Sequence, residues 1–400
     1  MMTSRLFPIR EATRRTIDRI CARCNLLFGV GLLALIGVLC GGVSGAFAQP
    51  PRADDDPPCG EPVRWLWRPQ TMCAEVIFEV SPSPGQMAIG AITFNDEGAL
   101  VFTRPDTRQI MRLPLDSRGV PGTPEVIAQG LPEAPLGITF EPTAGVLYIS
   151  ADSLIMKLDP VGTVTVLVRD LPGGAGRWLS NIRVGPDGRL YVVKGSGCDS
   201  CAEDDPRRAA LLSFAPDGSD PQIVGQGLRD SFDLGWFEGA LYVVDHERPE
   251  YPAELNRLEG PGSDFGFPGC AGDKQPTLPG VTCDHTSAPV VPFPPDSHPT
   301  GMVYYDHDLY PQLKGKLLVA LGGSWNGLEV TGYEISAVDL RQAKVERFLP
   351  VINRSSSDAS LIRASFYPAH LLGLAVDGRG WIYASTAEGR IYRFRPFPGR

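Results

Sequence analysis

The chain has 400 residues, of which 43% are hydrophobic and 21% are charged, and its formal net charge is −9 at pH 7. Without the first 48 residues, 31 basic and 44 acidic side chains remain, a net charge of −13. A chain with this negative charge is not a plausible partner for nucleic acid, whose phosphates are negative too. The excess of acidic side chains predicts a solvated, soluble surface.

Residues 1–48 predict an export signal rather than part of the fold. Six arginines precede an apolar run over residues 26–43, and the small-residue sequence Ala46-Phe47-Ala48 follows the run. Glycines interrupt the run, which favours a cleaved signal peptide over a permanent anchor. We therefore expect a periplasmic or secreted protein, with a membrane tether through an uncleaved leader as the alternative.

Residues 49–75 are predicted to be a leader that carries a loop between Cys59 and Cys73, and residues 76–396 to be the folded domain. The folded domain opens with an alternating pattern over residues 75–80, which is typical of a half-buried strand. We expect the strand Val76–Val80 to pair with the last strand, Ile391–Phe394, because this pairing removes exposed sheet edges.

Six copies of one pattern follow, each with a turn rich in Gly, Asp or Asn, a strand of the Leu-Tyr-Val type, a polar loop and a second strand. A four-stranded sheet of roughly 40 to 50 residues cannot bury both faces alone, so such units stack radially around a channel. The sequence therefore predicts an all-β fold, a six-bladed β-propeller. The six strand cores begin at Leu100, Leu147, Leu190, Leu241, Leu317 and Ile382.

The spacing of the copies is longest between Tyr242 and Leu318, at 76 residues. The excess must leave the sheet as loops, and loops held at the mouth of a propeller channel carry its chemistry. The insertion from Arg248 to Pro299 is therefore expected to form a lid or a pocket wall.

Six cysteines remain after the leader, an even set that suits an oxidising compartment. Fifteen pairings are open to them, and sequential pairing is favoured because each pair is then enclosed in one loop. Cys198 and Cys201 have the spacing of a redox motif, but no helix or βαβ pattern follows, so a structural bridge is favoured over a redox dithiol or zinc binding. The expected bridges are Cys59–Cys73, Cys198–Cys201 and Cys270–Cys283.

Several motifs in one order, over roughly Ile92 to Phe394, are similar to those of the soluble quinoprotein glucose and sorbosone dehydrogenase family. They include Gly188-Arg189-Leu190-Tyr191-Val192, Gly227-Leu228-Arg229-Asp230, Phe265-Gly266-Phe267-Pro268, Gly323-Ser324-Trp325-Asn326 and Gly389-Arg390-Ile391-Tyr392-Arg393. The resemblance implies an exported propeller that binds pyrroloquinoline quinone (PQQ) and calcium and oxidises a sugar or a sorbosone-type aldehyde. It implies cofactor contacts at Arg229, Asp230 and Lys194, and metal contacts at Glu247 and Phe265.

In that family a histidine after the Leu-Pro turn of the third blade accepts the sugar hydroxyl proton. Aligned on Gly185-Pro186-Asp187-Gly188, this chain has Arg177 there, and an arginine cannot accept a proton. We expect the Arg177 guanidinium near the channel mouth, close to Arg229 or Asp230. His298 and His370 are the alternative catalytic residues, because their loops lie just before inner strands.

The residues leave several functions open. One is a PQQ-dependent sugar or aldehyde dehydrogenase, in which His298 or His370 replaces the base. Another is a degenerate propeller that binds a carbohydrate, a small anion or a protein through its loop face, favoured by Asp230 and by the short loop 249–253 where the family has more acid. Lactonase-type hydrolysis would need a ring of carboxylates and Asn around a calcium ion, which the strands do not supply. The oligomeric state is not predicted.

Overall fold

The computed structural model describes residues 58–59, 72–174, 177, 179–325, 330–349 and 369–397. The chain divides into Met1–Pro50 and Pro51–Arg400, and all described residues belong to the second unit. The predicted signal peptide lies outside the described residues. The described residues form strands, turns and loops, so no helix among them is long and apolar enough to cross a membrane.

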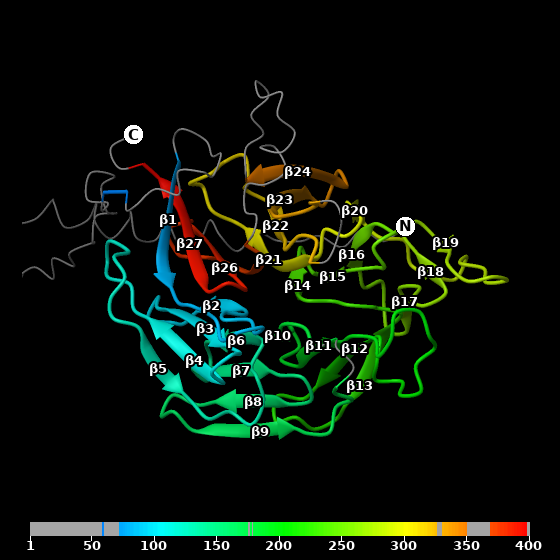
Figure 1. The fold of residues 1–400 in the computed structure, drawn as a ribbon, viewed down its shortest axis with the longest axis horizontal. Helices are drawn as coiled ribbons and strands as arrows, with labels where there is room; N and C mark the ends of the chain where they lie inside the picture. The colour runs from blue at the N-terminus through cyan, green and yellow to red at the C-terminus, as the bar shows by residue number, and fades with distance from the viewer. Residues whose placement is uncertain are drawn as a thin grey trace, which may run out of the picture. The chain divides into compact units, whose positions relative to one another are not determined.

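Six antiparallel sheets are arranged around a common centre, which confirms the six-bladed propeller (Figure 1). Blade 1 consists of β2 (Ile92–Phe94), β3 (Leu100–Arg104), β4 (Gln109–Leu113) and β5 (Glu125–Ala128). Blade 2 consists of β6 (Gly137–Glu141), β7 (Val146–Ser150), β8 (Ile155–Leu158) and β9 (Val164–Val168). Blade 3 consists of β10 (Arg183–Val184), β11 (Leu190–Lys194), β12 (Ala210–Phe214) and β13 (Gln222–Gln226).

Blade 4 consists of β14 (Leu234–Phe237), β15 (Ala240–Asp245), β16 (Ala253–Arg257) and β20 (Val291–Phe293). Blade 5 consists of β21 (Pro299–Tyr305), β22 (Lys316–Leu321), β23 (Glu334–Asp339) and β24 (Lys344–Leu349). Blade 6 consists of β25 (Leu371–Val376), β26 (Ile382–Thr386), β27 (Arg390–Pro396) and β1 (Met72–Glu79). Each of the six predicted strand cores is the second strand of its blade.

The predicted insertion Arg248–Pro299 is only partly a loop. It contains β16 and β20, which belong to blade 4, because the pattern of a turn and a Leu-Tyr strand marks the second strand of a blade but not the fourth. The excursion between these strands carries β17 (Ser263–Asp264), which pairs with β13, and the hairpin of β18 (Cys270–Ala271) and β19 (Gln275–Pro276).

The ring closes through β1, which pairs antiparallel with β27 as predicted. The strand begins at Met72, four residues before the predicted start, so the leader boundary at residue 75 is too late. The register shifts between Val76 and Phe78, a bulge that simple alternation does not reveal. All three predicted disulfides are present, and Cys59–Cys73 ties residue 59 to β1.

The closing strands share a buried ion cluster. Glu75 in β1 accepts hydrogen bonds from Arg393 Nε at 2.8 Å and Arg395 Nε at 2.7 Å, and all three side chains are at most 5% exposed. Both guanidinium groups also lie about 5 Å from the Trp381 ring centre, at 5.1 and 5.2 Å. One carboxylate therefore offsets part of two buried positive charges in the strands that close the ring.

Every junction between blades carries a hydrogen bond at the inner strands. Three of these bonds are donated by hydroxyl groups in second strands to carbonyls of the next blade. The other three join residues that lie in, or next to, the first strands of two neighbouring blades. The six bonds are Thr103 Oγ1 to Leu136 O, Ser150 Oγ to Ser180 O, Asn181 N to Phe232 O, Met302 N to Asp233 Oδ2, Thr300 Oγ1 to Leu371 O and Ser385 Oγ to Gly90 O.

The substitution Glu75→Gln should destabilise the protein by about 3 to 5 kcal/mol, because it removes the carboxylate that two buried guanidinium groups share. The control Glu79→Gln breaks an exposed pair with Arg390 in the same two strands and should cost less than about 1 kcal/mol. Urea unfolding followed by tryptophan fluorescence measures both. Equal, small shifts in the two variants would show that the buried cluster does not hold the ring closed.

Candidate functional site

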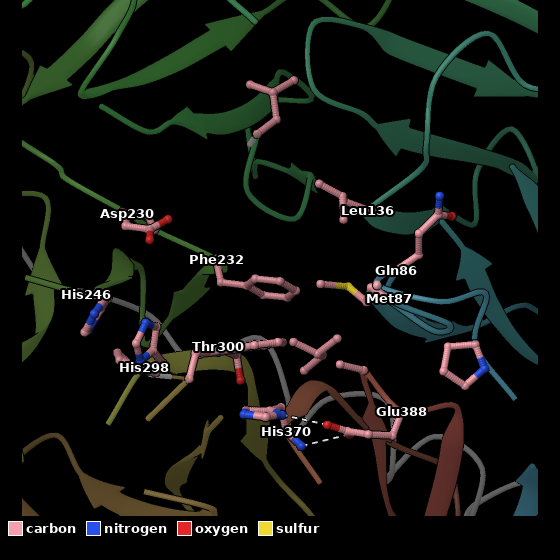
Figure 2. Close-up of a pocket in the computed structure, with 18 residues that line it drawn as sticks. Gln86, Met87, Leu136, Asp230, Phe232, His246, His298, Thr300, His370 and Glu388 are labelled. Carbon is pink, nitrogen blue, oxygen red and sulfur yellow. Dashed lines mark hydrogen bonds and ion pairs between the residues drawn. The ribbon is translucent and has the colours of Figure 1, made fainter. Parts of the chain in front are cut away.

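A cavity of about 560 Å³ lies at the end of the channel where the inner strands begin. Each blade contributes to it just before or at the start of its first strand, as Figure 2 shows for several of the side chains. The six contributions are the loop 82–87, Leu136, Leu179, residues 230–232, residues 298–300 and the pair His370 and Leu372. Because second strands run back to the same end, His246, Trp325 and Glu388 join them.

The lining is mostly apolar, with a few converging polar groups, as in small-molecule sites. Its charged side chains are the acids Asp230 and Glu388, and no described residue of the lining is Lys or Arg. The segment Arg248–Pro299, expected as a pocket wall, supplies only His298 and Pro299. The wall of the pocket is therefore formed by residues at or before the first strands of all six blades, not by the insertion.

His370 is held on several sides. Its Nδ1 lies 2.6 Å from Glu388 Oε1, and its backbone N donates to Glu388 Oε2 at 2.9 Å. Since a carboxylate only accepts, Nδ1 carries the hydrogen and Nε2 is left to face the Tyr333 hydroxyl at 3.3 Å. The Trp325 indole stacks on the imidazole with ring centres 3.8 Å apart and planes at 16°. Trp325 is itself 44% exposed and lines the cavity, so it forms a wall of the pocket.

His298 also reaches the pocket, where its ring stacks on His246 with centres 3.4 Å apart and planes at 26°. Burial lowers the pKa of His298 to about 4. Burial and the neighbouring His298 lower the pKa of His246 to about 2. Both imidazoles are therefore neutral near pH 7, so each has one nitrogen lone pair.

Arg177 lies beside Asp230, as predicted, with Nε 3.8 Å from Asp230 Oδ2. Its Nη1 donates to Cys198 O at 2.8 Å, and its Nη2 pairs with Asp199. The same Asp199 oxygen accepts from Arg229 Nη2 at 2.8 Å, so one carboxylate bridges the two guanidinium groups. Burial raises the pKa of Asp230 to about 6, although Arg177 opposes the shift.

Arg229 and Lys194 are occupied by the protein and do not line the cavity. Arg229 Nη1 donates to the carbonyls of His246 and Glu247 at 3.1 and 3.2 Å. Lys194 Nζ is fully buried and donates to Asp152 Oδ1 at 2.8 Å and to Arg177 O at 2.9 Å. The structure thus gives both cations protein acceptors at the positions where the resemblance implies cofactor contacts.

The two residues that the resemblance implies for calcium lie in a buried region next to the pocket. Phe265 packs its ring in the core of blades 3 to 5, and Glu247 is 2% exposed with Oε1 lacking a hydrogen-bond partner among the described residues. Burial, with Asp245 and Glu254 nearby, raises the pKa of Glu247 to about 9. Within the described residues these acids do not bring three ligand oxygens within 4.8 Å of one another.

Sequence reasoning missed Asp199, Glu388 and Asp296, and gave His246 no role. Asp199 lies 22 residues from Arg177, and Glu388 lies 18 residues from His370, so neither pair follows a local pattern. The position of Asp199 inside the Cys198–Cys201 loop was the one available signal, because a short bridged loop holds its side chains at a fixed place.

Comparison with known proteins supports the fold. The holo form of the pyranose dehydrogenase PQQ domain from Coprinopsis cinerea has a TM-score of 0.65 and 16% identity, over 82% of this chain and 97% of that chain. The PQQ-bound aldose sugar dehydrogenase from Streptomyces coelicolor has a TM-score of 0.58 and 18% identity, over 82% and 99%. The apo aldose sugar dehydrogenase from Escherichia coli has a TM-score of 0.61 and 15% identity, over 82% and 100%.

These structures confirm, at the level of the fold, the resemblance to soluble sugar dehydrogenase propellers. A family model described as strictosidine synthase-like, N-terminal, matches residues 373–394, which fall within β25 to β27 of blade 6. No curated protein sequence matches the chain.

The acid cluster yields a pH prediction for Glu254, which is 1% exposed and whose pKa burial raises from 4.5 to about 7. The folded state then holds a proton that the unfolded state releases, so stability falls as pH rises from about 4.5 to 7, by roughly 3 kcal/mol. Glu254→Gln should remove this loss and gain stability relative to wild type at pH 8 but not at pH 4.5. Asn256 Nδ2 now donates to Glu254 Oε2, and Asn256 Oδ1 has no partner among the described residues. If the Asn256 amide flips, its Oδ1 can accept a hydrogen bond from the amide nitrogen of the new Gln, so Gln fits at this position.

Thermal unfolding in a chelator from pH 4.5 to 8 measures the difference. The exposed Glu259→Gln changes the same charge and should give no pH-dependent difference. A constant offset between Glu254→Gln and wild type at all pH values would contradict the raised pKa.

Proposed function

We propose that this chain binds a neutral sugar or a sugar-like aldehyde in the pocket at the mouth of its propeller channel. One observation carries the proposal: the exposed Trp325 indole forms a wall of a cavity of about 560 Å³ and is stacked on a His370 that Glu388 holds in place. The pyranose and aldose sugar dehydrogenases that share the fold support a sugar as the ligand class.

A sugar ring has an apolar face of C–H groups and a rim of hydroxyls, and the pocket offers a match for each. The indole and the apolar side chains Met87, Phe232 and Leu372 suit the C–H face. The carboxylates of Asp230 and Glu388 suit the rim, because they accept hydrogen bonds from hydroxyls without requiring a charged ligand. The Ser231 and Thr300 hydroxyls donate to Asp245 and to Leu371 O, and they can accept from the ligand as well.

PQQ is a tricarboxylate, and its binding calls for cationic partners. Among the described residues none of the pocket lining is cationic. The Nη atoms of Arg177 and Arg229 donate to Asp199 and to backbone carbonyls, and only their Nε atoms lack a hydrogen-bond partner among the described residues. Asp230 and Glu388 would place negative charge beside such a ligand. The described residues therefore do not fit PQQ, and the described carboxylate side chains do not gather in a group of three around Glu247.

Sugar oxidation is the second candidate function, favoured by the PQQ-bound state of proteins with the same fold. In that case the hydride would pass to a two-electron acceptor bound beside the sugar. We infer that His370 accepts the hydroxyl proton, because Glu388 fixes the hydrogen on Nδ1 and stabilises the imidazolium that forms. Arg177 cannot take this part.

Trp325→Ala should lower the affinity for the sugar at least about tenfold, since stacking on an aromatic face contributes roughly 0.5 to 1.5 kcal/mol beyond the buried area. Trp325→Phe keeps an aromatic face and should retain most of the affinity. Calorimetry with D-glucose, D-galactose and sorbosone measures binding, and Val161→Ala, an exposed change distant in sequence from every lining segment, is the control. Equal affinities for Trp325→Ala and wild type would contradict the site.

Dye reduction with glucose or sorbosone should be weak or absent in the wild-type protein even with PQQ and calcium supplied, because the described lining offers no cationic side chain to the carboxylates of PQQ. Robust wild-type turnover that survives Arg177→Ala but is lost in His370→Asn would overturn this expectation and make the chain an oxidoreductase with His370 as its base.

A further inference from the structure

The pocket has two groups of polar side chains. One contains His370 beside Trp325, and the other contains His246 and His298. His246 follows β15 of blade 4, and His298 directly precedes β21 of blade 5. Asp296 lies two residues before His298 in the same loop. One ligand atom from each of the three side chains lies within 4.8 Å of the other two. Figure 2 shows the two imidazoles together at one side of the pocket.

We propose that His246, Asp296 and His298 form a binding site for a divalent transition-metal ion of the zinc class. Two imidazoles and one carboxylate are a three-ligand set that such ions accept, with a fourth position left open. Calcium is a poor occupant because it takes oxygen ligands almost exclusively. The site is therefore separate from the calcium contacts at Glu247 and Phe265 that the family resemblance implies.

The hydrogen bonds around the histidines favour this assignment. His246 is 5% exposed, and its Nδ1 has no hydrogen-bond partner among the described residues. A buried nitrogen without a partner costs free energy, which a bound ion would offset. His298 Nδ1 lies 3.4 Å from the Asp296 carbonyl and 3.6 Å from Asp296 Oδ1, so the carboxylate already stands beside the ring.

The distances are close to those that a metal needs. Bonds of about 2.0 to 2.2 Å in a tetrahedral site put neighbouring ligand atoms roughly 3.3 to 3.5 Å apart. The Asp296 and His298 atoms are 3.6 Å apart, and the three ligand atoms are all within 4.8 Å of one another. Binding would require the stacked rings, whose planes lie at 26°, to rotate so that one nitrogen lone pair of each points at the ion.

The ion would face the cavity, since His246 and His298 both line it while Asp296 does not. Its open position would then take a water molecule or an oxygen atom of the bound ligand. This places a Lewis-acidic centre in the same cavity as the aromatic wall at Trp325, without using any residue of the His370 and Glu388 pair.

The test uses the tag-free, full-length protein after chelator treatment and dialysis. Titration with Zn²⁺ followed by calorimetry should show one ion per chain, and Co²⁺ should give visible d–d bands without the sulfur-to-cobalt charge transfer of thiolate ligands. His246→Ala and His298→Asn should each weaken Zn²⁺ binding more than about a hundredfold, since even the loss of an outer-shell partner costs 10- to 100-fold. Asn suits residue 298 because its φ of 46° lies in the left-handed region that Asn tolerates.

His285→Ala is the matched control, because His285 is exposed and pairs with Asp264 outside the pocket. It should bind Zn²⁺ as the wild type does. Circular dichroism and thermal unfolding establish that each variant is folded, and the Zn²⁺-induced rise in melting temperature should disappear in His246→Ala and His298→Asn only. No binding by the wild type, or binding by His246→Ala and His298→Asn as tight as that of the wild type, would overturn the proposal, whatever the sugar-binding result.

Discussion

The pocket depends on the hydrogen bonds that join the inner strand of each blade to its neighbour. The channel end is lined by backbone near the first residues of inner strands, where carbonyl groups would otherwise be buried without partners. Hydroxyl groups of Thr103, Ser150 and Ser385 meet this need at three junctions. The approach is so close that a Cβ at Gly90 would lie 2.5 Å from Thr103 Oγ1, so glycine alone fits there. Six strand starts are thereby held around one cavity.

Electrostatics then decides what the cavity can hold. Arg177 and Arg229 share Asp199, which lies in the loop closed by the Cys198–Cys201 bridge, and Asp230 lies 3.8 Å from Arg177, so carboxylates of the protein already offset much of this positive charge next to the pocket. The lining keeps two acids and three imidazoles. Charged ligands of negative sign are disfavoured in such a site, whereas neutral polyhydroxy ligands and cations are not. The fold of a sugar dehydrogenase propeller is thus combined with a different charge balance among the described residues of its mouth.

The sequence was sufficient for the fold because a propeller repeats one local pattern, and all six Leu-Tyr strand cores became second strands. It was also sufficient for the three disulfides and for the placement of Arg177 beside Asp230. Prediction from the sequence failed where a side chain's partner is distant in sequence or where the strand pairing is irregular. The predicted strand Val76–Val80 left Glu75 in the leader, because the arginines that pair with Glu75 lie more than 300 positions away. Glu388 and Asp199 reach their partners only through the ring of blades.

The two groups of polar side chains in the pocket follow from the same antiparallel topology. A second strand ends where the next blade's first strand begins, so a residue after one strand meets a residue before another. His246 meets His298 across the junction of blades 4 and 5, and Trp325 meets His370 across the junction of blades 5 and 6. The position of each ring stack is therefore determined by how two neighbouring blades meet, and not by a separate loop. A propeller can change its chemistry by substituting these few junction residues, because the backbone hydrogen bonds within the blades do not depend on their side chains.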